Sequence, residues 1–449
     1  MGPVVLNPEY TTQVSVSHAR AAAFDILLRI ERDAAFATEL LHSKKIDELS
    51  IADRALTQEI VLGVLRWQSA LDAAIAAQSS QPLRKLDREV LLALRIGAYQ
   101  LRFLDRIPAN AAVNESVELV KRARKRSAVP FANAILRKLT REPQQSDTSS
   151  LAAEYAHPEW MVTRWIANYG RDAAEAICRH DQQIPHTAIR LPFDLARREA
   201  VETELLKSGI VLEPGHFLKA ARRIVSGDVR TTPAFQRADV WIQDEASQLV
   251  ALLAGNGNRI LDCCAAPGGK TAVLAERNPS ATVLAVELHD HRAKMLRDRV
   301  KNANVEVRTA DIAKLAVDGG FDCVLADVPC SGTGTLARNP EIKWRLQPGD
   351  LTDFSRSQTV ILRSALRQLS PGGRLVYSTC SLEPEEGEAV AEQALDAGFE
   401  LQNSKAELAK IGSELSISNP ETLFRGPFLR TIPGFQDSDG FFAAVILRH

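Results

Sequence analysis

The fold is decided by the stretch Asp262-Cys263-Cys264-Ala265-Ala266-Pro267-Gly268-Gly269-Lys270-Thr271, which follows the apolar pair Ile260-Leu261. An apolar strand that runs into glycine and small residues, with a helix after them, is typical of a ligand-binding turn in an α/β sheet. The backbone can approach a ligand closely there, and the helix start offers free N–H groups. The spacing matches neither the GxxxxGK[ST] phosphate loop nor the GxGxxG dinucleotide turn. The stretch therefore predicts a sheet that binds a different kind of ligand.

Short apolar runs alternate with helical stretches after Asp239. The strand candidates are residues 260–261, 283–286, 305–309, 323–326 and 375–377. This alternation predicts a parallel, doubly wound, Rossmann-like α/β domain over residues 238–449. A final apolar run, residues 441–447, predicts one more strand at the edge of the sheet.

Acidic residues follow three successive predicted strands, at Glu287, Asp311 and Asp327. Open α/β sheets bind ligands at the carboxyl edge of their strands, so these side chains are expected to meet the ligand of the glycine turn. Glu287 is placed to accept hydrogen bonds from both ribose hydroxyls, and Asp311 to meet an adenine amino group. Each acid taken singly is as well explained as a helix cap or turn former, but the set favours an adenosyl ligand. S-adenosylmethionine suits this site because it has no phosphates that would demand a phosphate loop.

The first third of the chain has a helical pattern and a basic charge. Apolar residues recur every three or four positions from Ser17 to Arg141, which predicts a compact all-helical domain over residues 1–145. The expected helices begin at the caps Ser17, Asp53 and Asp87 or cover residues 114–125 and 131–139. This part has 21 Lys and Arg against 16 Asp and Glu, and the rest has 34 against 40, so the net charge of -1 conceals a basic module. The run 121–126 holds five positive charges, which predicts either RNA contact or only a solvated helix end.

The middle of the chain is less informative. Residues 142–150 (EPQQSDTSS) have the polar composition of a linker. Residues 151–237 are expected to form a small α/β connector, with a helix around 159–169 and a strand at 187–191. Its composition does not indicate a role.

Two of the six cysteines stand in positions that suggest chemistry. The six are too sparse and uneven for a disulfide framework, which predicts a reducing, cytoplasmic compartment. Cys330 and Cys380 follow the fourth and fifth strands, in loops of small and polar residues where a thiol is accessible and can ionise. Cys178, Cys263 and Cys323 are interpreted as buried packing residues.

A thiol beside a methyl donor has a specific use. C5 of cytosine is a poor nucleophile, and addition of a thiolate to C6 makes C5 enamine-like. Asp327, close to Cys330, is placed to hydrogen-bond N3 and lower the barrier to that addition. A base such as a second cysteine then removes the C5 proton so that the enzyme thiol is eliminated. Position alone leaves open whether Cys330 or Cys380 attacks.

Three ordered motifs, Cys264–Lys270, Asp327–Gly334 and Ser378–Ser381, resemble those of the RNA cytosine-C5 methyltransferases. Residues 107–108, 113–119 and 131–136 resemble the NusB-type RNA-binding helical domain. The whole arrangement is similar to the bacterial 16S ribosomal RNA enzymes of the Sun or Fmu type. The resemblance implies a multi-domain enzyme with a NusB-like bundle, a small connector and a methyltransferase domain. It also implies that the enzyme uses S-adenosylmethionine to form 5-methylcytosine in 16S rRNA.

The resemblance also implies residue roles. Cys380 is the nucleophile and Cys330 helps to release the product, whereas in DNA cytosine-C5 methyltransferases the Pro-Cys cysteine attacks. Asp327 contacts N3, and Lys270 is a further candidate for the reacting centre. Two departures are mild: Val328 stands where alanine is commoner, and Glu287 where aspartate is often found. The implied donor-binding residues are Cys264, Ala265, Ala266, Pro267, Gly268, Gly269, Lys270, Glu287, Asp311 and Asp327.

Other functions stay open at this point. One is a non-catalytic RNA-binding or antitermination factor, and another is a C5 methyltransferase acting on another RNA such as tRNA. A third is a methyltransferase acting on an exocyclic amine, which leaves Cys380 unexplained. No apolar run approaches the roughly 20 residues that span a bilayer. We therefore expect a cytoplasmic monomer with no membrane or DNA partner and no metal.

Overall fold

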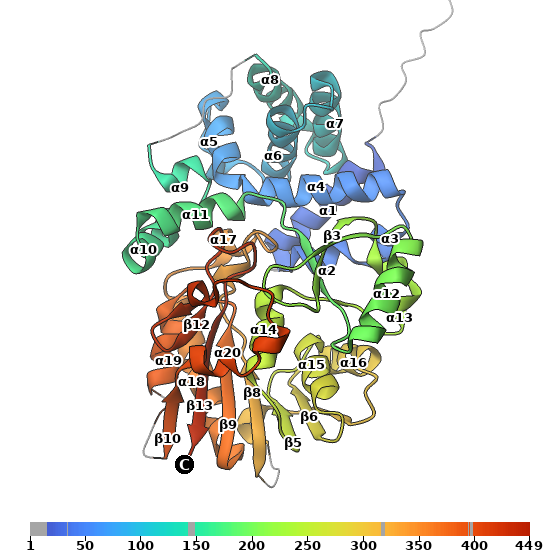
Figure 1. The fold of residues 1–449 in the computed structure, drawn as a ribbon. Helices are drawn as coiled ribbons and strands as arrows, with labels where there is room; N and C mark the ends of the chain where they lie inside the picture. Colours follow the sequence, from blue (N-terminus) through green and yellow to red (C-terminus); the bar gives the residue numbers. More distant parts are fainter. Residues whose placement is uncertain (1–15, 34, 142–148, 316–318, 394, 396–397) are drawn as a thin grey trace, which may run out of the picture. The chain divides into compact units, whose positions relative to one another are not determined.

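The computed structural model describes residues 16–33, 35–141, 149–315, 319–393, 395 and 398–449. The chain forms two compact units (Figure 1). Unit 1 runs to Val162 and also contains the short segment Asn339–Arg345, and unit 2 comprises Thr163–Arg338 and Leu346–His449. The domain boundaries drawn from the sequence, 1–145, 151–237 and 238–449, stay a prediction.

Unit 1 is built from helices around one apolar core. Its helices are α1 (His18–Asp33), α2 (Ala37–Leu41), α3 (Lys44–Asp47), α4 (Ile51–Arg66), α5 (Gln68–Gln78), α6 (Arg88–Phe103), α7 (Ala109–Arg122), α8 (Val129–Leu139), α9 (Leu151–Glu154) and α17 (Ile342–Arg345). The prediction that Asp53 caps the second helix is wrong. Ser50 is the cap, because its side chain accepts a hydrogen bond from the Asp53 backbone N–H at 3.1 Å. Among the described residues no single helix is long and apolar enough to cross a membrane, although α4 and α5, bent by 77° at their junction, together pass a test of length and composition.

Helix α17 reaches unit 1 from far along the chain. Trp344 Nε1 donates to the Leu65 carbonyl at 2.6 Å, near the end of α4. Lys343 Nζ donates to the carbonyls of Arg66 at 2.8 Å and Ala156 at 3.0 Å. Ile342 is buried. The segment is therefore part of the packing of the helical unit, which its sequence does not reveal.

The connector crosses from unit 1 into unit 2 after Val162, within its first long helix. Helices α10 (Glu159–Tyr169) and α11 (Arg171–Asp181) precede a four-stranded antiparallel sheet of order β2-β3-β1-β4. Its strands are β1 (Thr187–Arg190), β2 (Val211–Pro214), β3 (Ala221–Ser226) and β4 (Trp241–Ile242), with α12 (Leu195–Lys207) and α13 (Pro233–Gln236) beside them. The predicted helix at 159–169 and strand at 187–191 are confirmed as α10 and β1.

The larger sheet of unit 2 contains a parallel core of order β7-β6-β5-β8-β9. These strands are β5 (Arg259–Asp262), β6 (Thr282–Glu287), β7 (Val305–Thr309), β8 (Phe321–Asp327) and β9 (Leu369–Thr379), so all five strand candidates are confirmed. The final run forms β13 (Phe442–Arg448), but its prediction as an edge strand is wrong. β13 pairs antiparallel with β9 on one side and with β10 (Phe399–Gln402) and β12 (Phe428–Arg430) on the other, and β12 in turn pairs with β11 (Phe424–Arg425).

Helices cover both faces of this sheet. Alternate strand residues point to opposite sides, so that Ile260 belongs to the core under α14 (Glu245–Leu253), α15 (Gly269–Arg277) and α20 (Ser404–Ala409). Leu261 belongs to the core under α18 (Asp350–Gln368) and α19 (Glu388–Gln393). Figure 1 shows α15 and α16 (Asp290–Arg299) in yellow next to β5 and β6. The doubly wound α/β architecture is thereby confirmed.

Candidate active site

The carboxyl ends of the parallel strands bring the predicted site residues to one edge of the sheet. The register places Asp327 at the end of β8 beside Ser378 of β9, and Glu287 at the end of β6 beside Thr309 of β7. The glycine turn follows β5, which lies between β6 and β8. The sites suspected from sequence thus follow one another along a single edge.

The glycine turn is fixed by its neighbours. Gly268 has φ +108°, and a Cβ there would lie 2.7 Å from Leu296 and 2.8 Å from Val300, so only glycine fits. Thr271 Oγ1 donates to Asp262 Oδ2 at 2.7 Å, which ties the end of β5 to the first turn of α15. The other oxygen, Asp262 Oδ1, is buried and has no hydrogen-bond partner among the described residues. Burial raises the pKa of Asp262 to about 7.

The two acids proposed for the donor differ in their surroundings. Glu287 is only 4% exposed, and its Oε1 accepts a hydrogen bond from the His289 backbone N–H at 3.1 Å. Its Oε2 faces Arg292 at 3.8 Å. Asp311 is more exposed and caps a short helical turn by accepting from the Ala313 N–H at 2.9 Å. The cap interpretation therefore holds for one oxygen of Asp311, and Glu287 keeps a buried carboxylate at a strand end.

Asp327 and Lys270 form an ion pair beside the glycine turn. Lys270 Nζ lies 2.7 Å from Asp327 Oδ2, and Ser378 Oγ donates to Asp327 Oδ1 at 2.7 Å. Burial acts to lower the pKa of Lys270, but the attraction and hydrogen bond of Asp327 outweigh it and the pKa is raised. Lys270 is therefore an ammonium ion at neutral pH, and two donors already engage the Asp327 carboxylate.

The two cysteines of interest face each other. Cys330 Sγ and Cys380 Sγ are 3.3 Å apart, and both residues are half-buried. The hydrogen bond to Cys380 raises the pKa of Cys330 well above its ordinary value, and burial raises it further. Cys330 consequently keeps its proton at neutral pH. The prediction that its loop lets it ionise is wrong, because the loop packs it against the second sulfur.

Glu386, which the sequence argument missed, joins the two cysteine loops. It is fully buried and accepts hydrogen bonds from the Ser331 backbone N–H at 2.8 Å and from Ser381 Oγ at 2.5 Å. The hydroxyl of Ser331 also donates to it. Each serine directly follows one of the cysteines. The only signal in the sequence is the run Glu383-Pro-Glu-Glu close behind Cys380, which resembles an ordinary polar turn.

The remaining cysteines are unsuited to nucleophilic chemistry. Cys178, Cys263 and Cys323 are buried and are not in disulfides, in agreement with their interpretation as packing residues. Burial raises the pKa of Cys323 to about 12. Cys264, in the glycine turn, is half-buried and its pKa is raised chiefly by burial.

The basic run at the end of α7 is partly neutralised within unit 1. Lys121 pairs with Glu118 at 2.6 Å, Arg122 with Asp25 at 2.9 Å and Lys125 with Asp87 at 3.1 Å. Two of its residues, Arg124 and Arg126, are exposed and form no ion pair with any described residue. Three of the five charges are therefore balanced within unit 1, as expected for an ordinary helix end. The charges of Arg124 and Arg126 stay available to a polyanion.

Comparison with known proteins shows which family the chain belongs to. A model described as 16S rRNA methyltransferase RsmB/F matches residues 249–447, the NusB family model matches 17–141, and a RsmF/B-like ferredoxin-like domain model matches 157–229. The probable ribosomal RNA small subunit methyltransferase B of Bacillus subtilis (strain 168) is 32% identical over 439 residues, covering 94% of this chain and 97% of the relative. The ribosomal RNA small subunit methyltransferase B of Vibrio vulnificus (strain YJ016) is 32% identical over 445 residues, covering 96% and 99%. The chain belongs to the RsmB/F family of 16S rRNA methyltransferases.

Solved structures agree with membership of the RsmB/F family. The crystal structure of a protein named PH0851 is 25% identical, with a TM-score of 0.80 and coverage of 97% of this chain and 99% of that one. NSun6 from Pyrococcus horikoshii with SFG shares the fold, with a TM-score of 0.56, 18% identity and coverage of 65% and 98%. The resemblance drawn from the sequence motifs is confirmed, and the chain is an S-adenosylmethionine-dependent RNA methyltransferase.

The site of this RsmB/F member has the chemistry to hold the methyl donor. Glu287 presents a buried carboxylate at a strand end, as a ribose diol requires. Asp262 presents a buried oxygen without a partner among the described residues next to the glycine turn. The N-terminus of α15 adds backbone donors at the same edge. A neutral ribose and a carboxylate-bearing amino acid fit this set of groups.

Proposed function

We propose that the protein transfers a methyl group from S-adenosylmethionine to C5 of a specific cytosine in 16S rRNA, through a covalent adduct between Cys380 and C6. The observation that carries this proposal is the meeting of two thiols, 3.3 Å apart, at the ends of neighbouring strands. Methylation of an exocyclic amine needs no nucleophile and would leave this pair without a use. The ion pair of Lys270 and Asp327 beside the thiols supplies the charges that cytosine activation needs.

The donor site is formed by the glycine turn and the three acids. We assign Cys264, Ala265, Ala266, Pro267, Gly268, Gly269, Lys270, Glu287, Asp311 and Asp327 to it. S-adenosylmethionine, when bound, supplies an electrophilic methyl group to the activated C5. Glu287 orients the ribose through its buried carboxylate, and Asp311 retains one carboxylate oxygen beyond its capping bond for the adenine amino group.

Cys380 and Cys330 have complementary roles in this proposal. The Cys380 thiolate adds to C6, forming the S–C6 bond and moving the C5–C6 electron pair to C5. The Lys270 ammonium lies close enough to Cys380 for its pKa to respond to a charge on that sulfur, and it stabilises the thiolate. Cys330 mediates the later removal of the C5 proton, after which the C6–S bond breaks and the ring double bond re-forms. Cys330 keeps its own proton at neutral pH, so it assists this step by hydrogen bonding to the departing Cys380 sulfur, 3.3 Å away.

Asp327 is the group that meets N3. Ser378 and Lys270 both donate to it, so that its side chain is held in one orientation. When N3 takes the proton that Cys380 releases on becoming a thiolate, the Asp327 carboxylate accepts a hydrogen bond from the new N–H, and the protonated ring is attacked more readily. Lys270 thus acts on both partners of the addition.

The two cysteine variants test the chemistry. Cys380→Ala is expected to abolish methylation and to form no adduct. In Cys330→Ala, Cys380 is still expected to attack C6, and a covalent protein–RNA complex should then accumulate and be visible on a denaturing gel. Cys263→Ala, which changes a buried thiol away from the pair, serves as the matched control and should form no lasting complex. Normal turnover by Cys330→Ala together with trapping by Cys380→Ala would reverse the two assignments.

The RNA itself is tested separately. The purified protein is offered a 16S rRNA transcript and, in parallel, a tRNA transcript, and 5-methylcytosine is located by bisulfite sequencing. Methylation at one cytosine of the 16S transcript is the expected result. Methylation of the tRNA alone would support the alternative RNA, and failure of the purified protein to bind S-adenosylmethionine would favour a non-catalytic RNA-binding factor.

A further inference from the structure

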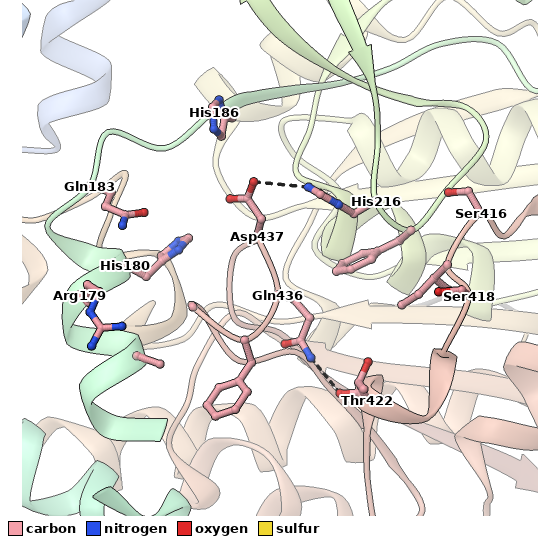
Figure 2. Close-up of a pocket in the computed structure, with 15 residues that line it drawn as sticks. Arg179, His180, Gln183, His186, His216, Ser416, Ser418, Thr422, Gln436 and Asp437 are labelled. Carbon is pink, nitrogen blue, oxygen red and sulfur yellow. Dashed lines mark hydrogen bonds and ion pairs between the residues drawn. The ribbon is translucent and has the colours of Figure 1, made fainter. Parts of the chain in front are cut away.

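A second pocket lies in unit 2, apart from the methyl-transfer site (Figure 2). It has a volume of about 730 Å³, within the usual range for a site that holds a small organic group. Its lining comes from α11 and the segment after it, from the loop at His216, and from the C-terminal segments 416–422 and 434–437. None of the donor-site residues and neither catalytic cysteine is among the described residues that line it.

The pocket offers a flat ring and unused polar side chains. Phe435 is 60% exposed. Its loop is held firmly, because Gly434, at φ +86°, packs so closely on α11 that a Cβ there would lie 2.3 Å from the Ala176 carbonyl oxygen. Side chains that both donate and accept line the same space, and they form no side-chain hydrogen bond with another described residue: Gln183, Ser416 and Ser418. A ring beside amides and hydroxyls is the combination that binds an unpaired base by stacking and by hydrogen bonds to its edge.

The charges of the pocket suit one nucleotide and not a polyphosphate. The Asp437 carboxylate is balanced by Arg223 at 2.5 Å, and the ring of His216 lies 3.5 Å from it. Burial lowers the pKa of His180, so that its ring is neutral at pH 7 and can donate or accept. Arg179, whose side chain is drawn in Figure 2, is already paired with Glu175 of the same helix. The charged side chains of the pocket are thus paired with each other or with neighbours, and the neutral polar groups that are left suit one base and not a polyphosphate.

A short path of backbone joins the pocket to the nucleophile. Asp437 lies three residues before Gly440, a length of chain that spans at most about 11 Å. The Gly440 N–H donates to the Gly334 carbonyl at 2.7 Å, and the Gly334 N–H donates to the Cys380 carbonyl at 2.9 Å. The pocket therefore lies within reach of a few unpaired nucleotides on either side of a cytosine presented to Cys380.

We infer that this pocket binds one unpaired nucleotide of the RNA substrate that flanks the target cytosine. Its base stacks on Phe435, and its polar edge is read by Gln183, Ser416 and Ser418. Contacts to neighbouring nucleotides are a general means by which an enzyme that acts on an extruded base selects its site. The inference rests on the proposed function, and it names the part of the protein that selects the sequence around the target.

The test compares the full-length variants Phe435→Ala and Gln183→Ala with wild type. We expect the KM for a 16S rRNA transcript to rise about 5- to 100-fold in Phe435→Ala, since stacking on an aromatic ring carries much of such binding. Gln183→Ala should relax the preference for one flanking base. Binding of S-adenosylhomocysteine, measured by calorimetry, should not change in either variant. Leu206→Ala removes an equally exposed apolar side chain, 68% exposed on α12, and should leave the KM unchanged.

Photocrosslinking separates failure of this inference from failure of the proposed function. The transcript carries 4-thiouridine next to the target, and its crosslinks are mapped by mass spectrometry in the wild-type complex and in the Cys330→Ala adduct. Crosslinks at Phe435 or its neighbours support the inference. An adduct that forms normally while crosslinks fall elsewhere and the Phe435→Ala KM is unchanged overturns the inference and leaves the proposed function standing. If Phe435→Ala loses activity on ribosomal subunits that contain protein but keeps it on naked RNA, the inference is overturned and the pocket binds a protein partner instead.

Discussion

A single buried carboxylate holds the two cysteine loops at one distance from each other. Glu386 accepts hydrogen bonds from Ser331 and Ser381, each one residue beyond a cysteine. The two sulfur atoms contact each other directly at 3.3 Å, and the register of Ser331 against Ser381, whose hydroxyl oxygens are 3.0 Å apart, helps to set that separation. Glu386 is accordingly a positioning residue and not a catalytic one.

Glu386→Gln should therefore impair turnover more than it impairs binding. The amide offers one acceptor oxygen where the carboxylate offers two, so one of the loops loses its anchor. A displacement of about 1 Å at a reacting group can cost on the order of 100-fold, and we expect kcat to fall about 10- to 100-fold. The KM for S-adenosylmethionine should stay near its wild-type value. Glu385→Gln, at a half-exposed neighbour that pairs with Arg164, is the control; equal losses in both variants would contradict the positioning role.

Asp262 should give the folding stability a specific pH dependence. Burial raises its pKa to about 7, against an ordinary value near 4 in the unfolded chain. The folded protein thus keeps a proton that the unfolded chain has already released, and this contribution to stability is full below pH 4 and is lost as the pH rises to 7. The full loss is about 4 kcal/mol at most.

Asp262→Asn should remove the loss of folding stability between pH 4 and 7. Its amide oxygen can still accept the hydrogen bond from Thr271. We expect the free energy of unfolding of the variant, relative to wild type, to increase from pH 4.5 to 7 and to stay level above pH 7.5. Urea titrations at four pH values measure it. A difference that does not vary with pH would mean that Asp262 is already ionised throughout this range.

Among the secondary-structure elements, the sequence predicts the apolar, parallel strands. It does not predict the short, exposed strands, which are strands only because they hydrogen-bond to a neighbouring strand. Strands β5, β6 and β8 and the end of β9 are found because each contains a short apolar run that is buried on both faces, and β7 is found because its apolar residues alternate with polar ones. Strands β2 and β11 are mostly exposed and short, and only their partners make them strands. The sequence predicts β13 at the edge of the sheet because its own residues give no sign that β10 and β12 pair with its outer side.

The candidate site divides in the same way. The glycine turn and the two cysteines are readable because their residue types are chemically rare at strand ends. The protonation of Cys330 and the role of Glu386 depend on contacts between loops 50 and 55 residues apart, and no local pattern encodes them.

The end of α7 makes a further prediction at this scale. Arg124 and Arg126 are its exposed cations without an ion pair among the described residues, whereas Glu118 engages Lys121. Arg124→Ala and Arg126→Ala should each weaken RNA binding and lower the slope of log affinity against log salt by about 1. Lys121→Ala should have a smaller effect, because its charge is already balanced. Filter binding at several salt concentrations measures all three, and equal effects would show that the ion pair does not matter.

At the scale of the whole molecule, the stability of the helical unit depends on residues that lie near the catalytic motifs in sequence. Trp344 donates to the carbonyl of Leu65 and packs on the core of the helical unit, although it follows Cys330 by only fourteen positions. Trp344→Ala should therefore lower the Tm of unit 1 and cost about 2–4 kcal/mol. Scanning calorimetry of the full chain measures this, and S-adenosylhomocysteine identifies the transition of unit 2 because it raises only that one. A shift confined to the ligand-sensitive transition would contradict the prediction.

The passage of residues 339–345 through unit 1 has a consequence for how such a protein can change during evolution. The chain crosses between the units at three places, after residues 162, 338 and 345. A recombination event that exchanged the first 162 residues for another helical domain would leave Trp344 and Lys343 facing an unfamiliar surface. The two parts are therefore expected to be inherited together, and exchange of the RNA-binding part in the laboratory must transplant the distant heptapeptide with it.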